Sequence, residues 1–130
     1  MEHRACLLEL KEGAKPYHDR PYQASKTRKE TTIKEINTLC ELGVMEFLSA
    51  SEWASPSFII LKSDQIVWTI SDFRAVNKLL IRKPFPIPKI STVLQELEGF
   101  TFATVLDLNM GYYTIRLDPD ACKICTIIFP

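Results

Sequence analysis

Apolar residues recur at helical spacing in one segment near the start of the chain, residues 27–42. They form a single apolar stripe, as in an amphipathic helix. The stripe consists of Ile33, Ile36, Leu39, Cys40 and Leu42. Thr27 and Glu30 have the spacing of a capping box, and Gly43 supplies a C-terminal stop. The pattern therefore predicts a scaffold helix over Thr27–Leu42.

Two short apolar runs later in the chain have the composition of β-strands. Phe58–Leu61 and Ile66–Ile70 are separated by a short polar stretch, which predicts a β-hairpin. Ser49–Ser57, which precedes them, is rich in small and polar residues and predicts a loop. A further short strand is predicted at Ala5–Lys11.

Three prolines between residues 83 and 88 exclude a regular helix or central strand there and predict an extended connector. A short amphipathic helix is predicted to begin at Ser91 or Thr92 and to end at Gly99. Alternation over Tyr113–Leu117 permits a strand, but we favour a short helical turn.

The segment Thr101–Leu117 carries the strongest candidate for chemistry, Asp107. The apolar run before it predicts a strand buried on both faces. Such a strand carries an acid for one of two reasons: the carboxylate caps the following turn, or it binds a metal ion. In the second case a neighbouring main-chain carbonyl would be a further Mg²⁺ ligand.

Polar residues also cluster directly after the second predicted hairpin strand. They are Asp72, Arg74, Asn77 and Lys78, with Phe73 among them. One interpretation is turn capping with a solvated rim, and the other is contact with phosphate and sugar, to which Arg, Lys and Asn are suited.

Charge is balanced over the whole chain but unevenly distributed. Residues 60–90 hold six bases and two acids, whereas residues 91–130 hold five acids and two bases. A basic segment before an acidic one fits a protein that binds a polyanion and holds cations beside it, although solvated surface charge has the same pattern.

The four cysteines predict reduced thiols in an intracellular protein. Cys122 and Cys125 have no second pair for a zinc site, and on a strand they would point to opposite faces.

Four segments in order resemble the reverse transcriptase of gypsy-class LTR retrotransposons: SEWASPSFIILK, ISDFRAVNK, RKPFPIPKISTVLQELEGF and ATVLDLNMGYYTIRLDPDA. The resemblance covers nearly the whole chain. It implies an α+β fold, a partial right-hand polymerase that stops before the second catalytic carboxylate motif. The implied parts are an N-terminal connector with a short strand (1–25), fingers (26–90) and the first, incomplete part of the palm (91–130).

The resemblance also implies roles for individual residues. Asp107 falls on the first catalytic, metal-binding aspartate, with the Leu108 carbonyl as its neighbouring ligand. The incoming nucleotide would be bound by Lys62, Met110, Gly111 and Tyr112, with Tyr112 packing under the sugar. Arg74 falls on a residue that steadies the template. Asp72, Phe73 and Asn77 match the same block, where the resemblance favours a scaffold role. Asp72, Asn77 and Lys78 are assigned with Arg74 to the template and primer.

The chain departs from the family pattern at several positions. Ser63-Asp64-Gln65 stands where the family has Lys-Asp-Gly, and Trp68 stands where it has an arginine that contacts the triphosphate. Losing such a contact would cost on the order of 10²-fold in rate. No Asp-Asp pair occurs in the chain, and two-metal phosphoryl transfer needs carboxylates that hold both ions.

The resulting expectation is a fragment of an RNA-directed DNA polymerase, inactive alone. Its parent reaction is Mg²⁺-dependent deoxynucleotidyl transfer to a primer 3′-hydroxyl. The partners implied are a template–primer, a deoxynucleotide and the rest of the Pol polyprotein, in the cytoplasm or nucleus and without a membrane. The alternative is a non-catalytic nucleic-acid-binding or interaction remnant of a decayed element. A third reading is a fragment without function that folds poorly because its palm sheet has an open edge.

Overall fold

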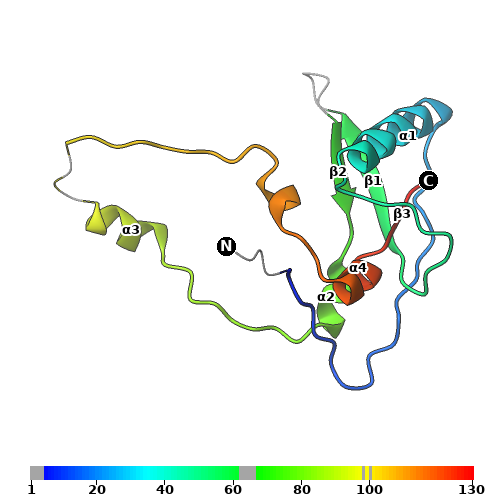
Figure 1. Ribbon diagram of the computed structural model, residues 1–130, viewed down its shortest axis with the longest axis horizontal. Coiled ribbons are helices and arrows are strands. Elements are labelled where there is room, and N and C mark those ends of the chain that lie inside the picture. The colour runs from blue at the N-terminus through cyan, green and yellow to red at the C-terminus, as the bar shows by residue number, and fades with distance from the viewer. Residues whose placement is uncertain (1–4, 62–66, 98, 100) are drawn as a thin grey trace. The chain divides into compact units, whose positions relative to one another are not determined.

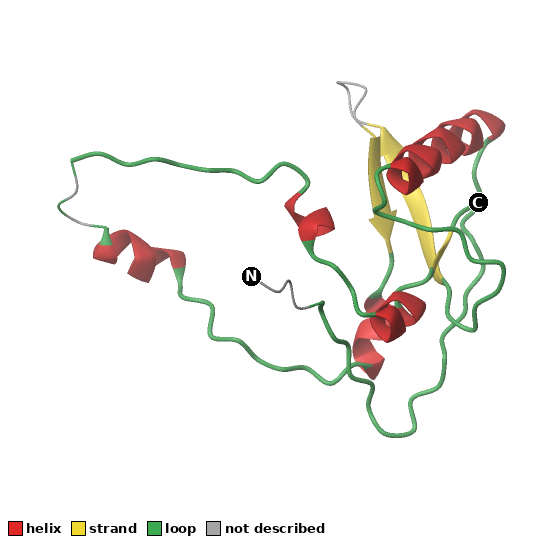
Figure 2. Cartoon of the chain, in the orientation of Figure 1, coloured by secondary structure: helices red, strands yellow, loops and turns green. Residues whose placement is uncertain are grey.

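The computed structural model describes residues 5–61, 67–97, 99 and 101–130 of the chain (Figure 1). Helices and strands are joined by long irregular segments, as Figure 2 shows. In chain order the elements are α1 (Lys26–Glu41), β1 (Ser55–Leu61), β2 (Val67–Ser71), α2 (Arg74–Leu79), α3 (Ile90–Glu96), the 3₁₀ helix η1 (Gly111–Thr114), α4 (Pro119–Ile124) and β3 (Ile127–Ile128). This mixture of helices with a small sheet agrees with the predicted α+β class.

The sheet has the strand order β2-β1-β3. β1 and β2 are antiparallel with Phe58 opposite Ile70, which confirms the predicted hairpin. β1 begins at Ser55, earlier than predicted, because its first residues pair in parallel with β3. That pairing joins segments far apart in the chain, so no local signal in the predicted loop revealed it.

α1 matches the predicted helix, but its N-terminal cap is a different residue. The hydroxyl of Ser25 accepts a hydrogen bond from the Arg28 main-chain N–H at 3.4 Å. The predicted capping box beginning at Thr27 is therefore wrong, because Thr27 already lies inside the helix. Gly43 follows the helix with φ +70°, as a C-terminal stop requires. α1 lies against β1 (Figure 1).

The hydrophobic core is formed where α2 and α4 meet the segment before β1. Trp53, Val76 and Ile124 are buried together, and half-buried residues pack around them. Those residues are Leu8, Leu10, Tyr17, Phe73, Leu79 and Leu80. The core thereby fixes the start of α2, which follows β2 directly.

The predicted strand at Ala5–Lys11 forms single bridges to two partners instead of one continuous strand. Cys6 pairs with Leu117, and Leu10 pairs with Leu80. Because the segment changes partner within a few residues, it does not form one ladder. It nevertheless contributes apolar side chains to the core.

The chain divides into two compact units. The first comprises the chain up to Ile81 together with Ile115–Pro130, and the second is Arg82–Thr114. The first unit contains the sheet and the core. The predicted connector at 83–88 lies in the second unit and has neither helix nor strand, as expected.

In the second unit, the predicted buried strand before Asp107 is wrong. Residues 102–108 are irregular, and Val105 and Leu106 are 90% and 88% exposed. A strand needs a neighbour that pairs with its main-chain N–H and C=O groups, and the described residues of this unit contain no strand. α3 begins at Ile90, slightly earlier than predicted, and none of its residues is buried.

Two further predictions concern the segment after Asp107. The short helical turn favoured there is confirmed by η1, where the Tyr113 N–H donates to the Met110 carbonyl at 2.9 Å. The strand considered for Cys122 and Cys125 is wrong, because Cys122 lies in α4 and Cys125 is its C-cap. Pro119 and the capping carboxylate of Asp118 begin that helix.

Candidate nucleic-acid interface

A carboxylate and a guanidinium form a tight pair where β2 ends and α2 begins. Asp72 Oδ1 accepts hydrogen bonds from Arg74 Nε at 2.9 Å and from the Arg74 main-chain N–H at 3.1 Å. Asp72 Oδ2 accepts from Arg74 Nη2 at 2.7 Å. We call this two-pronged pair the Asp72–Arg74 fork. It forms because the acid lies two residues before the arginine at the start of a helix.

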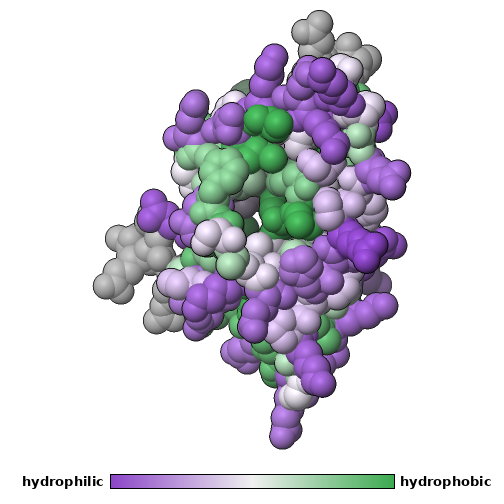
Figure 3. Space-filling model, turned by 90° about the vertical axis from the view of Figure 1, so that its right-hand side faces the viewer, coloured by the Kyte–Doolittle hydropathy of each residue, from purple (hydrophilic) through white to green (hydrophobic). Residues whose placement is uncertain are grey.

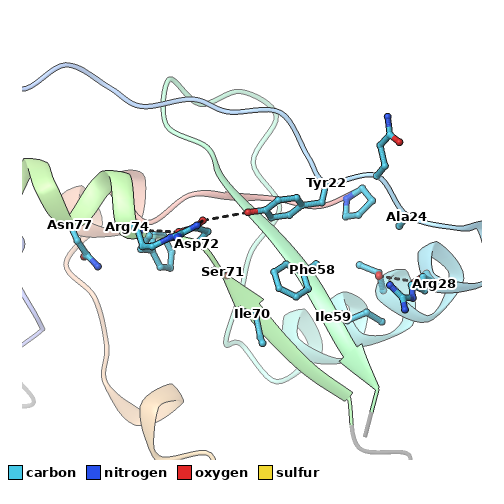
Figure 4. A pocket seen from close by; sticks show the side chains of 14 residues that line it. Tyr22, Ala24, Arg28, Phe58, Ile59, Ile70, Ser71, Asp72, Arg74 and Asn77 are labelled. Carbon is cyan, nitrogen blue, oxygen red and sulfur yellow. Dashed lines mark hydrogen bonds and ion pairs between the residues drawn. The ribbon is translucent and has the colours of Figure 1, made fainter.

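Two aromatic rings lie beside the fork. The rings of Tyr22 and Phe58 meet edge to face, with centroids 5.4 Å apart and planes at 89°. The Tyr22 hydroxyl donates to Asp72 Oδ2 at 3.4 Å, so the ring and the fork are linked (Figure 4). Tyr22 keeps 41% of its surface exposed and therefore still presents ring surface to solvent.

These groups line an open hollow of about 880 Å³, which we call the Tyr22–Arg74 hollow. Its lining comes from the segment before α1, from α1, from β1 and β2, from the start of α2 and from the last residue. The lining residues are Tyr22, Gln23, Ala24, Arg28, Thr32, Phe58, Ile59, Ile70, Ser71, Asp72, Phe73, Arg74, Asn77 and Pro130. Figure 4 shows Arg74 and Asn77 at one end and Arg28 at the other. A guanidinium lies at each end of the hollow, that of Arg74 paired with Asp72, and the aromatic rings lie between them. Such an arrangement suits a polyanion that also carries flat rings.

The molecular surface mixes apolar and polar residues on the face shown in Figure 3. Apolar side chains gather there around a hollowed region, and hydrophilic side chains surround them. Trp68 is 50% exposed on β2 opposite Ile60.

The fork determines the electrostatics of the hollow. The Arg74 side chain, and next its main-chain N–H, hold the pKa of Asp72 well below the usual range. The same hydrogen bonds to Asp72 raise the pKa of Arg74 further, so both groups stay charged at neutral pH. The Arg74 side chain is 86% exposed and that of Asp72 only 20%. Because solvent reaches the guanidinium and screens its charge, the pair stabilises the fold very little.

The structure brings together three of the residues predicted to contact template and primer: Asp72, Arg74 and Asn77 line the hollow. Lys78 is exposed on α2 and is not among the lining residues, although its carbonyl accepts a hydrogen bond from Lys11 Nζ at 2.7 Å. Lys62, predicted to bind the nucleotide, lies outside the described residues.

The remaining predicted site residues lie in the second unit. Asp107 and Leu108 are exposed in irregular chain, and Met110, with φ 52°, leads into η1. Gly111 and Tyr112 belong to η1, where the Thr114 hydroxyl donates to the Gly111 carbonyl at 2.6 Å. Their assignment to metal and nucleotide stays a prediction.

The Mg²⁺ site expected at Asp107 stays a prediction. Over the described ranges, no three His, Cys, Asp or Glu side chains gather as metal ligands would. Asp107 therefore has no such ligand set around it. A metal site on the thiols is not favoured either. Burial, and then the neighbouring Cys122 and Cys6, raise the pKa of Cys125. A raised pKa disfavours the thiolate that a metal would bind.

Sequence reasoning missed Tyr22, Phe58 and Arg28. Tyr22 belongs to a polar connector, Phe58 to an apolar strand and Arg28 to the first turn of α1. Nothing in their spacing says that they line one hollow. The only local signal was an aromatic residue followed within a few positions by the basic residues at the start of a helix.

Comparison with known proteins identifies relatives along most of the chain, although no protein-family model matches it. The retrovirus-related Pol polyprotein from transposon 412 of Drosophila melanogaster is 29% identical over 117 residues, 85% of this chain and 9% of the polyprotein. The Pol polyprotein from transposon gypsy of the same species is 28% identical over 108 residues, 78% of this chain and 10% of the polyprotein. The chain is related to the Pol polyproteins of LTR retrotransposons.

This relationship confirms the resemblance to gypsy-class Pol proteins, which was inferred from the four sequence motifs. A shorter match, 37% identical over 46 residues, is to an RNA-directed DNA polymerase homolog from Oenothera berteroana; it covers 35% of this chain and 32% of that protein. The chain spans about a tenth of the length of the two Pol polyproteins. Over the described residues, no helix is long and apolar enough to cross a bilayer.

Proposed function

We propose that this Pol-related chain is a segment of a reverse transcriptase, comprising fingers and the first part of the palm. The proposal is supported by the four ordered sequence motifs, by the similarity to Pol polyproteins and by the shorter match to an RNA-directed DNA polymerase homolog. The parent reaction would be attack of a primer 3′-hydroxyl on a deoxynucleotide, with pyrophosphate leaving. The rest of the Pol polyprotein would supply the remaining parts of the enzyme.

For the chain itself, the activity that the geometry supports best is binding of a single nucleic-acid strand in the Tyr22–Arg74 hollow. The observation that carries this proposal is the Asp72–Arg74 fork beside the Tyr22–Phe58 rings. A base can stack on an exposed ring whatever its identity, while a guanidinium binds the adjoining phosphate. The strand held in this way would be the template.

Catalysis by the chain alone is not part of this proposal. Holding both ions of a two-metal transfer requires carboxylates in addition to Asp107, and the described residues supply no such cluster. The Mg²⁺ requirement therefore stays a proposal for the parent enzyme, with Asp107 and the Leu108 carbonyl as the contribution of this chain. The second candidate function, a binding remnant without catalysis, is favoured by Trp68, which cannot neutralise a phosphate.

Binding is tested with a labelled single strand of about 12 nucleotides, followed by fluorescence anisotropy across salt concentrations. Arg74→Ala should weaken binding about threefold to tenfold and lower the salt slope by about 0.7 to 1. Arg116→Ala is the matched control, because Arg116 is an exposed arginine of the same unit that does not line the hollow. Equal losses in the two arginine variants would contradict the proposed site.

The stacking part of the proposal has its own pair of variants. Tyr22→Phe keeps the ring and should bind about as well as the unmodified chain. Tyr22→Leu keeps an apolar side chain but loses the ring, and should weaken binding about fivefold or more. Asp107→Asn should leave binding unchanged, whereas primer extension that depends on Asp107 would show that the chain is itself catalytic.

A further inference from the structure

The two partners of the Asp72–Arg74 fork are held very differently. Asp72 accepts hydrogen bonds from the Arg74 side chain, from the Arg74 main-chain N–H and from the Tyr22 hydroxyl. Its side chain is 20% exposed, whereas the Arg74 side chain is 86% exposed. The acid is therefore a fixed part of the wall of the hollow, and the guanidinium is the part that solvent and ligands can reach.

The fork leaves Arg74 able to bind a phosphate, but with reduced strength. A guanidinium has five N–H donors, and the fork uses its Nε donor and one at Nη2. The remaining donors can reach a ligand. A phosphate placed there also faces the negative charge of Asp72 on the far side of the guanidinium, so the attraction to Arg74 is partly cancelled.

We propose that Asp72 limits the affinity of the Tyr22–Arg74 hollow for phosphate and so makes binding depend on a base that stacks in the hollow. This inference rests on the proposed strand-binding function and adds a specificity-determining role for Asp72, which does not itself bind the strand. A weakly held phosphate cannot retain a ligand alone. A single strand offers free bases to the aromatic rings, whereas a duplex keeps its bases stacked inside and offers mainly phosphate.

The test compares two asparagine variants of the 130-residue chain. Asp72→Asn removes the negative charge of the fork and leaves the positive charge of Arg74. Asp120→Asn removes the same charge from another exposed ion pair of the first unit, with Lys123 at 2.9 Å, and Asp120 does not line the hollow. The probes are a labelled single strand of about 12 nucleotides and the duplex of the same sequence, between about 50 and 200 mM salt.

Asp72→Asn should bind the single strand about twofold to fivefold more tightly than the unmodified chain, with a salt slope steeper by about 0.7. The gain in affinity for the duplex should be larger than the gain for the single strand, so that the preference of Asp72→Asn for the single strand falls. Asp120→Asn should change neither the preference nor the slope. Asp72→Glu, which restores the charge, should return binding towards that of the unmodified chain.

Asp72→Ser provides a second neutral variant, because a serine hydroxyl can still accept the hydrogen bond from the Arg74 main-chain N–H. Thermal unfolding checks that each variant is folded. The proposal is overturned if folded Asp72→Asn or Asp72→Ser binds no more tightly than the unmodified chain, or if Asp120→Asn tightens binding equally. In those cases the binding measurements on the Tyr22 and Arg74 variants still test the strand-binding function independently. A chain that binds neither probe at about 50 mM salt would overturn both proposals.

Discussion

Replacing Val76 by alanine is expected to destabilise the protein by about 2 kcal/mol. Val76 is 2% exposed and packs in the core with Trp53 and Ile124. It is the buried residue of α2, the helix that begins with Arg74. The substitution therefore removes the principal anchor between that helix and the core.

The magnitude follows from the groups that are lost. Valine to alanine deletes two buried methyl groups, each worth about 0.8 kcal/mol of transfer free energy. The cavity left behind brings the total to about 2 kcal/mol, because the surrounding side chains collapse only partly. This value corresponds to roughly a thirtyfold increase in the unfolding equilibrium constant.

The matched control makes the same deletion at Val105, which is 90% exposed in the second unit. Val105→Ala should change the free energy of unfolding by less than about 0.5 kcal/mol. Urea unfolding followed by tryptophan fluorescence measures both variants, because the buried Trp53 reports on the core that contains Val76. The slope of each transition shows whether the compactness of either state has changed.

The reasoning would be refuted if Val105→Ala destabilised the protein as much as Val76→Ala. That result would mean that the apolar run before Asp107 is buried in the folded chain, as its composition first indicated. A loss below about 0.5 kcal/mol for Val76→Ala would instead show that the core around Trp53 does not stabilise the fold.

Three further predictions concern local structure and charge. Ser25→Ala should cost about 1 kcal/mol and reduce helicity by circular dichroism, whereas Thr27→Ala should leave the N-terminal cap of α1 intact. Gly43→Ala should lower the free energy of unfolding in urea by about 1 kcal/mol, because Gly43 has a φ of +70°. The backbone conformation alone causes this loss, since an added Cβ would meet nothing within 4 Å. Gly43→Asn should lower the free energy of unfolding by less. The Asp72 carboxyl should remain ionised in an NMR titration below pH 3.8, the usual value, because its pKa is lowered in the folded chain. Its contribution to stability is thus present above the unfolded pKa and is lost only as pH falls through the lower folded pKa; titration at the usual value would contradict the fork.

The sequence by itself determined the elements whose signals are local. The helical stripe, the stop at Gly43, the β-hairpin and the proline connector were all predicted, because each depends on residues a few positions apart. The cluster around Asp72 and Arg74 was also found, since polar residues directly after a strand are visible without a fold. These features reflect main-chain preferences and side-chain periodicity, which act within a turn or two.

Only the tertiary structure decided which side chains meet and which are buried. The ring of Tyr22 reaches Phe58 because the segment before α1 passes over β1, and the pairing of β1 with β3 joins distant parts of the chain. The apolar run before Asp107 has the composition of a buried strand, but the second unit gives it no partner strand among its described residues. Burial depends on a neighbouring surface as well as on the side chain itself, so composition alone could not determine it.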